Sequence, residues 1–252
     1  MLWHKSWLDT RWRFLVPLII LAFNIWGLIF NYAQVAKVLP TLHADGVGEG
    51  PLGRAIQEAI EAERTFSGFV WYQWFRQNLM QMGTVFAALL GSGSLFTGPT
   101  SGTLFTLALP VSRNRWLAAR TVIGLGELLM LAVIPSLVIP VASSAIGQHY
   151  DVATAVVHSL CLFVVCTMFF CLALLFSTLF ADTWRPLLFA CGIAIVAGLL
   201  ESEIGFYGFF HVMSGWTYYR NASVPWIGLL VSTAISAALL YGAATNVARK
   251  DF

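Results

Sequence analysis

The side chains that most often perform catalysis are scattered along this sequence and form no recognisable catalytic group. The segment Gly91-Ser92-Gly93-Ser94 has the small residues of a serine-nucleophile turn, but it is not a Gly-x-Ser-x-Gly motif. The histidines show no His-x-x-Glu-His or similar spacing; they are His4, His43, His149, His158 and His211. We therefore expect neither a catalytic residue nor a metal site, and we do not predict an enzyme.

Nucleotide binding and cysteine chemistry are not predicted either. A P-loop needs a glycine-rich turn directly before its lysine, and none of the three lysines, Lys5, Lys37 and Lys250, follows such a turn. We expect the chain itself to bind no ATP by that route and no cofactor. The cysteines lie in apolar runs without a paired metal-ligand spacing, so we interpret them as small packing residues; they are Cys161, Cys166, Cys171 and Cys191.

The composition indicates a membrane protein. Of the 252 residues, 58% are hydrophobic and 10% are charged, and the mean hydropathy is +0.77. Because a soluble domain carries about 25% charged residues, we predict an all-α polytopic membrane protein. The net charge of +2 gives no indication of a nucleic-acid partner, and none is predicted.

Six apolar segments are interpreted as transmembrane helices, since a span takes roughly 20 apolar residues. They cover residues 14–30, 78–96, 121–146, 153–180, 186–200 and 226–245. The first is expected to be retained, because no small-x-small cleavage site follows it. In the second, the small residues between Ala87 and Gly93 suit close helix packing. In the third, Pro135 and Pro140 predict a kink or a break.

The charges are distributed unequally between the two sides of the predicted bundle. Six spans put both termini and the second and fourth connections on one side, and these segments hold nine basic and three acidic residues, a balance of +6. The segments on the other side hold five basic and eight acidic residues, a balance of −3. By the positive-inside rule, we predict that both termini are cytoplasmic.

Two external segments are predicted to be ordered. Residues 51–66 put apolar residues such as Leu52, Ile56 and Ile60 on one helical face and charged residues on the other. This indicates an external amphipathic helix, which is either a lid or spacer or part of a functional surface. Residues 201–225 contain IGFYGFFHVMSGWTYY, which is too aromatic for a solvated loop and too interrupted by glycine for a full span. We predict an external re-entrant hairpin covered by neighbouring helices.

Glu127 is the ionisable side chain that lies most clearly inside a predicted span. A charged group at that depth is costly, and such residues usually face the bundle interior or a water-filled cavity. Our hypothesis is that Glu127 lines a translocation cavity near its cytoplasmic end. The alternative is a protonated or hydrogen-bonded glutamate that bridges helices.

The connection between the second and third spans contains a short segment that is neither a span nor a solvated loop. Residues 102–109 are mostly apolar, follow a cluster of helix breakers and end at Pro110, and Arg113, Arg115 and Arg120 come next. We predict a short cytoplasmic helix that docks against the headgroup layer, the protein itself or another chain.

The stretch SGTLFTLALPVSRNRWLAAR resembles the corresponding part of the permease subunits of type-2 ABC exporters: Gly-Thr-Leu, an apolar stretch, Leu-Pro-Val-Ser-Arg, then Ala-Arg entering a helix. Those subunits have about six spans, cytoplasmic termini, a coupling helix between spans two and three, and re-entrant helices between spans five and six. The ending NVARKDF is also similar to theirs. This chain departs from the family in having no acidic residue at positions 98–101, so no ion pair with an ATPase is implied there.

The resemblance implies the permease subunit of an ATP-driven exporter in a bacterial or archaeal cytoplasmic (inner) membrane. Its implied partners are a separate ATPase subunit that binds ATP-Mg, a second permease copy or paralogue, and membrane lipid. The residues implied in coupling to the ATPase are Gly102, Thr103, Leu104, Phe105, Leu107, Arg113 and Arg115. The alternative is an ATP-independent membrane carrier or a structural subunit of a membrane assembly, although the chain lacks the internal repeat that is usual in carriers.

Overall fold

The computed structural model describes residues 2–38, 57, 59–93, 113–180, 182–204 and 208–249. These residues form helices and the turns between them, with no strand among them, so the predicted all-α class is confirmed. Five helices are long and apolar enough to cross a membrane, as expected of a multi-pass membrane protein. They are α1 (Leu2–Val38), α6 (Arg113–Ala145), α7 (Val152–Leu179), α8 (Trp184–Ile204) and α11 (Trp226–Arg249).

A further long helix is assembled from three consecutive parts. α3 (Phe66–Val70), the π-helix η3 (Trp71–Leu79) and α4 (Met80–Gly91) follow one another, and the residues at both junctions keep right-handed helical backbone angles. The hydroxyl of Thr65 caps the start of α3 by accepting a hydrogen bond from the Gly68 N–H. Residues 78–91 of the predicted span 78–96 therefore belong to a helix that begins at Phe66 and ends at Gly91.

The helix α6 is continuous through Pro135 and Pro140, so of the predicted kink or break, the break does not occur. Hydroxyl groups satisfy backbone carbonyls close to both prolines. Ser136 donates to the Ala132 carbonyl at 2.8 Å, and Ser143 donates to the Pro140 carbonyl at 3.0 Å. The carbonyls that lose a backbone donor at these prolines are those of Leu131 and Ser136, so the two hydroxyl bonds are additional to the helix ladder and do not replace the missing bonds.

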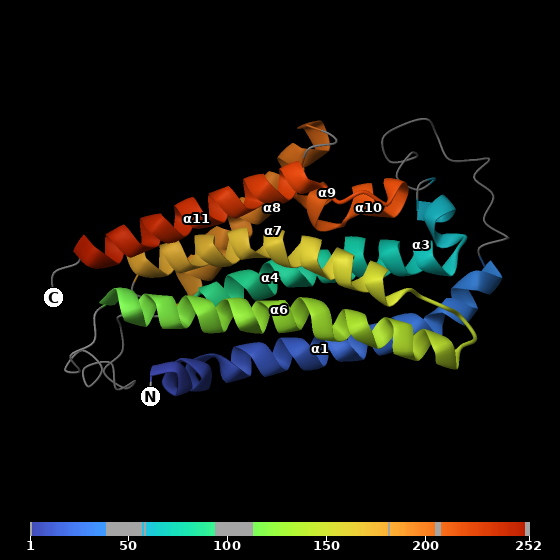
Figure 1. The fold of residues 1–252 in the computed structure, drawn as a ribbon, viewed down its shortest axis with the longest axis horizontal. Coiled ribbons are helices and arrows are strands. Elements are labelled where there is room, and N and C mark those ends of the chain that lie inside the picture. The colour runs from blue at the N-terminus through green and yellow to red at the C-terminus, as the bar shows by residue number, and fades with distance from the viewer. Residues whose placement is uncertain are drawn as a thin grey trace.

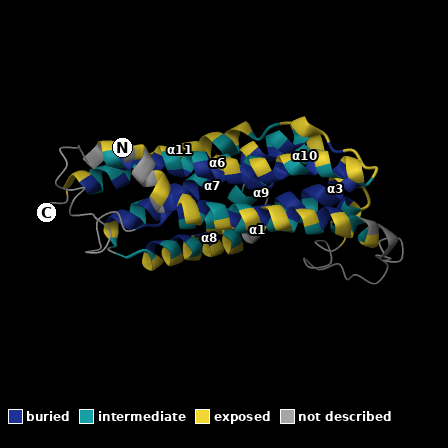
Figure 2. Ribbon diagram, turned by 90° about the horizontal axis from the view of Figure 1, so that it is seen from below, coloured by how far each residue is buried: buried dark blue, intermediate teal, exposed yellow. Residues whose placement is uncertain are grey.

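The helix α7 forms the centre of the bundle and packs against α4, α6, α8 and α11. Within its most apolar stretch 61% of the residues are buried, compared with 17% for both α8 and α11. Figure 2 shows buried positions along α7 and exposed positions along the outer face of α8. The outer face of α1 is exposed in the same way. The outer faces of α8 and α11 are thus left for lipid or another chain to cover.

Different helices form the two ends of the bundle. Figure 1 shows the start of α1, the start of α6 and the end of α11 at one end, with α3 and two short helices, α9 (Phe209–Met213) and α10 (Trp216–Asn221), towards the other. The predicted hairpin 201–225 corresponds to α9 and α10, but its first residues continue α8 as far as Ile204. The predicted docking helix 102–109 lies outside the described residues. Of the predicted amphipathic helix 51–66, the described residues from Ala59 to Glu63 are helical.

Candidate functional site

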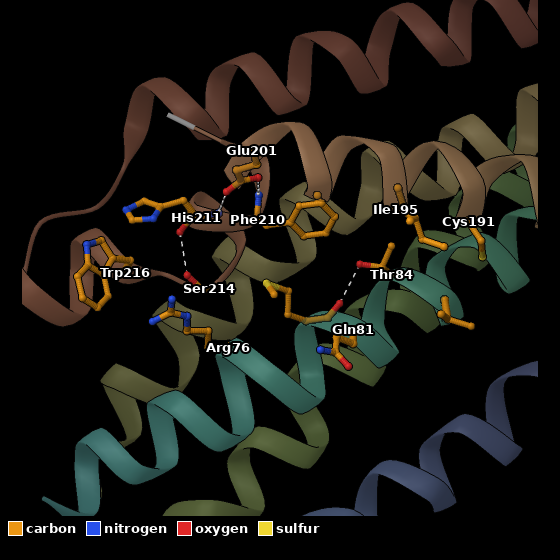
Figure 3. Close-up of a pocket in the computed structure, with 14 residues that line it drawn as sticks. Arg76, Gln81, Thr84, Cys191, Ile195, Glu201, Phe210, His211, Ser214 and Trp216 are labelled. Carbon is orange, nitrogen blue, oxygen red and sulfur yellow. Dashed lines mark hydrogen bonds between the residues drawn. The ribbon is translucent and has the colours of Figure 1, made fainter. Parts of the chain in front are cut away.

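A cavity of about 680 Å³ lies between α4, α8 and the α9–α10 pair (Figure 3). Its volume falls in the range of small-molecule pockets, about 300–1,000 Å³. The α4 wall has Met80 and Val85 beside the polar side chains of Gln81 and Thr84, and the α8 wall includes Ala194 and Ile195. The Thr84 hydroxyl donates to the Met80 carbonyl of its own helix at 2.8 Å. Polar side chains and Trp216 gather at the end next to α9 and α10; they are Arg76, Glu201, His211, Ser214 and Trp216. The cavity is therefore amphipathic along its length.

Glu201 holds the short helix α9 against the end of α8. One carboxylate oxygen accepts the Phe210 N–H at 2.7 Å, and the other accepts the His211 N–H at 2.6 Å (Figure 3). The first N–H groups of a helix have no partner within the helix, so this carboxylate satisfies two donors that α9 could not satisfy itself. Glu201 thereby builds one wall of the cavity.

Arg76 brings a positive charge to the polar end of the cavity. Its guanidinium carbon lies 5.5 Å from the ring centre of Trp71, 5.3 Å from that of Tyr72 and 5.8 Å from that of Trp216. A guanidinium group within about 6 Å of an aromatic ring is attracted by the ring electrons. Three rings therefore hold the Arg76 side chain on the cavity wall.

The turn between α9 and α10 is fixed to η3 by a tryptophan. The indole N–H of Trp71 donates to the Ser214 carbonyl at 2.9 Å. The Trp71 ring also stacks on Tyr219 of α10, with ring centres 4.4 Å apart and planes 6° apart. At Gly215 the backbone φ of +66° and a close approach to His158 both require glycine, since a Cβ would lie 2.7 Å from the imidazole ring.

The π-helical segment η3 carries both Arg76 and a row of buried apolar side chains. Trp71, Trp74, Phe75 and Leu79 point into the core and are at most 1% exposed, whereas Arg76 lines the cavity. The indole N–H of Trp74 donates to the Ser136 hydroxyl of α6 at 3.1 Å, which satisfies the only polar atom of that buried side chain. π-Helical segments occur frequently at functional sites.

The structure places Glu127 away from this cavity. Glu127 is 2% exposed, and one of its carboxylate oxygens accepts a hydrogen bond of 2.5 Å from the Thr10 hydroxyl. It therefore lies in the contact between α1 and α6, where it bridges two helices, and it is not among the residues that line the cavity of Figure 3. The helix-bridging alternative describes its position.

The residues predicted to couple to an ATPase are only partly described. Gly102, Thr103, Leu104, Phe105 and Leu107 lie outside the described residues, and Arg113 and Arg115 belong to the first turn of α6, where Arg115 is exposed.

Ser92 and Gly93, the last described residues before the predicted docking segment, form hydrogen bonds with three other helices. The Ser92 carbonyl accepts hydrogen bonds from Arg13 of α1 and, at 3.2 Å, from Arg120 of α6. The Gly93 N–H donates to the Ser177 hydroxyl of α7 at 3.2 Å. The end of α4 is thus joined to α1, α6 and α7, and Gly93 lies nine positions before the predicted docking segment begins at Gly102.

Sequence reasoning did not select Arg76 or Glu201 as site residues. A signal for Arg76 was present, because the stretch WYQWFRQNL repeats its apolar residues at helical spacing with one cation among aromatic rings. No local signal exists for Glu201, whose role depends on the return of α9 to the end of α8.

Comparisons with protein-family models, with curated proteins and with solved structures find no match for this chain. Its function is therefore inferred from the residues and their geometry.

Proposed function

We propose that this chain is the transmembrane permease subunit of an ATP-driven exporter of the type-2 ABC class. A separate ATPase subunit binds and hydrolyses ATP, and a second permease, identical or related, completes the translocation path. The chain itself carries out no catalysis.

The observation that carries the proposal is the order and direction of the helices. In Figure 1, α1, the α3–η3–α4 helix, α6, α7, α8 and α11 run alternately along the bundle, and α9 and α10 lie between the fifth and sixth of these. The α3–η3–α4 helix takes the role of the second span. This agrees with the layout implied by the resemblance of the stretch around Gly102.

The distribution of charge supports the orientation. The end of the bundle that holds the start of α1 and the end of α11 carries basic residues on several helices; they are Arg11, Arg13, Arg115, Arg120, Arg185 and Arg249. With positive charge retained inside, this end is cytoplasmic, and the α9–α10 pair and the cavity lie towards the external end.

Coupling follows from the position of α4. The docking segment 102–109 receives the movement of the ATPase and follows the end of α4, where Ser92 is held by Arg13 and Arg120. Because α4 also forms a wall of the cavity, a shift of its cytoplasmic end changes the shape of the translocation path.

The test is co-purification of the tagged chain from its native membrane. The wild type is expected to carry a nucleotide-binding polypeptide and ATPase activity, and Phe105→Asp/Leu107→Asp is expected to lose both while still inserting into the membrane. A matched control, Gln148→Asp/Ser223→Asp, places the same charges on exposed residues at the opposite end and should keep both. A wild type without any ATPase would instead favour an ATP-independent carrier or a structural subunit.

A further inference from the structure

The cavity between α4, α8 and the α9–α10 pair has the chemistry of a site for an anionic amphiphile. We propose that it binds a molecule with an apolar chain and a single anionic head group, which enters sideways from the membrane. As a statement about cargo this rests on the proposed permease function, but binding itself requires no ATPase.

The apolar chain is accommodated between α4 and α8. The cavity is lined by Met80 and Val85 of α4 and by Ala194, Ile195 and Phe210 of α8 and α9. Two of these residues also form its rim, because Val85 is 47% exposed and Ile195 is 64% exposed on the outside of the bundle. In a bilayer such surface faces lipid, so the open side of the cavity connects with the acyl-chain region rather than with water.

The head group of the ligand would lie at the polar end of the cavity, where the charged side chains are. Arg76 brings a guanidinium to the described cavity wall, whereas Arg220, whose guanidinium carbon lies 4.9 Å from the ring centre of Trp216, is not among the lining residues. The acidic group on the cavity wall, Glu201, uses both carboxylate oxygens for the N–H groups of α9. The Ser214 hydroxyl donates to the His211 carbonyl at 2.9 Å. Arg76 and Glu201 thus bring charges of opposite sign to the described wall, but both Glu201 oxygens are turned to the N–H groups of α9. The guanidinium of Arg76 is therefore the charged group that can meet a head group, and an anion is the head group that fits it.

The selectivity test measures binding of radiolabelled hexadecyl phosphate to the purified chain in a non-ionic detergent. Unlabelled hexadecyl phosphate is expected to compete at least about tenfold better than hexadecanol, which has the same chain without the charge. Equal competition by the two would overturn the proposal with the wild-type protein alone.

A pair of variants tests the role of Arg76. Arg76→Gln is expected to raise the Kd for hexadecyl phosphate by about tenfold or more, because it removes a charge-assisted contact. Arg220→Gln removes the same charge from the same ring but not from the cavity wall, so its Kd should change by less than about threefold. Arg76→Lys, which keeps the charge, should keep most of the affinity. Equal effects of Arg76→Gln and Arg220→Gln would overturn the assignment of the head-group position.

The two proposals fail separately. Charge-selective binding without an associated ATPase would leave the site and remove the permease function. An associated ATPase with no preference for hexadecyl phosphate over hexadecanol would leave the permease function and remove the anionic amphiphile.

Discussion

Replacing Glu201 with glutamine is expected to loosen the helix α9 without unfolding the bundle. The carboxylate accepts N–H groups of α9 at 2.7 and 2.6 Å, and hydrogen bonds to a charged group contribute about 1.5–3 kcal/mol each. Glutamine keeps one acceptor oxygen but turns its NH₂ group towards the second N–H. One bond is therefore lost and the other is no longer charge-assisted. Because Glu201 is only half-buried, a value in the lower part of that range applies to the whole change, about 1.5 kcal/mol.

This loss corresponds to an approximately tenfold increase in local opening. Hydrogen exchange followed by mass spectrometry should show amide protection in a peptide covering 208–216 falling by about that factor, while peptides of α7 keep theirs. Glu61→Gln is the matched control, since Glu61 is an exposed glutamate just before α3, at the same end of the bundle. Unchanged exchange at 208–216 in Glu201→Gln would refute the argument that this carboxylate holds α9 in place.

Three further predictions concern the rest of the bundle. In Gly91→Ala the new Cβ would lie 2.3 Å from the Phe170 carbonyl oxygen, so we expect destabilisation by about 1–3 kcal/mol in reversible unfolding, whereas Gly126→Ala, with nothing within 4 Å, should be neutral or stabilising. Thr10→Val should cost about 1–3 kcal/mol by removing the hydroxyl that donates to Glu127, and Glu127→Gln should cost less because its amide oxygen still accepts that bond; equal costs would contradict the contact. The pKa of Asp151 is lowered because its carboxylate accepts hydrogen bonds from the backbone N–H and the hydroxyl of Thr154. The stabilising cap is therefore present above the unfolded-state pKa of Asp151 and is lost as the pH falls through the lowered, folded-state pKa. The NMR chemical shift of the Thr154 amide should follow this titration in the wild type and should not change with pH in Asp151→Asn.

The apolar content of the sequence was sufficient to predict the all-α class and the five long apolar helices. These predictions depend on hydropathy and length, and both are properties of the chain alone. The close packing predicted for the small residues of the second span is seen at Gly91, which lies against Phe170 and Ala173 of α7.

The start of the second long helix could not be predicted from hydropathy, because its polar side chains form hydrogen bonds and ring contacts that exist only in the folded chain. The Gln73 amide donates to Glu63 at 2.5 Å, and the Asn78 amide donates to the Gln73 carbonyl at 2.7 Å. Arg76 lies among aromatic rings from two parts of the chain. A hydropathy profile includes the full free energy of transferring these side chains into lipid, whereas their partners in the fold offset that free energy.

The candidate site was missed for a related reason. Glu127 is conspicuous in the sequence as a lone acid in an apolar run, yet Thr10, 117 positions away, supplies its partner and makes it part of a helix contact. Glu201 occurs at the end of an apolar run and was not predicted as a site residue, yet it shapes the cavity. The position of a charge in the sequence shows that it needs a partner but not which partner it finds.

The proposed coupling requires that movement at the cytoplasmic end of α4 reach the cavity, and the packing around α4 is suited to this. From Val85 on the cavity wall to Gly91 the helix rises about 9 Å at 1.5 Å per residue, so one rigid segment connects the two places. Along this segment α4 meets α7 and α8 through a cluster of small side chains, Ala88, Ala173 and Ala190. Small side chains present low ridges, which allow one helix to slide along another without a change of rotamer. Under the proposed function, Ala88→Leu should therefore reduce transport while ATPase association at the docking segment persists. Normal transport by a well-folded Ala88→Leu variant would show that α4 does not move along this contact.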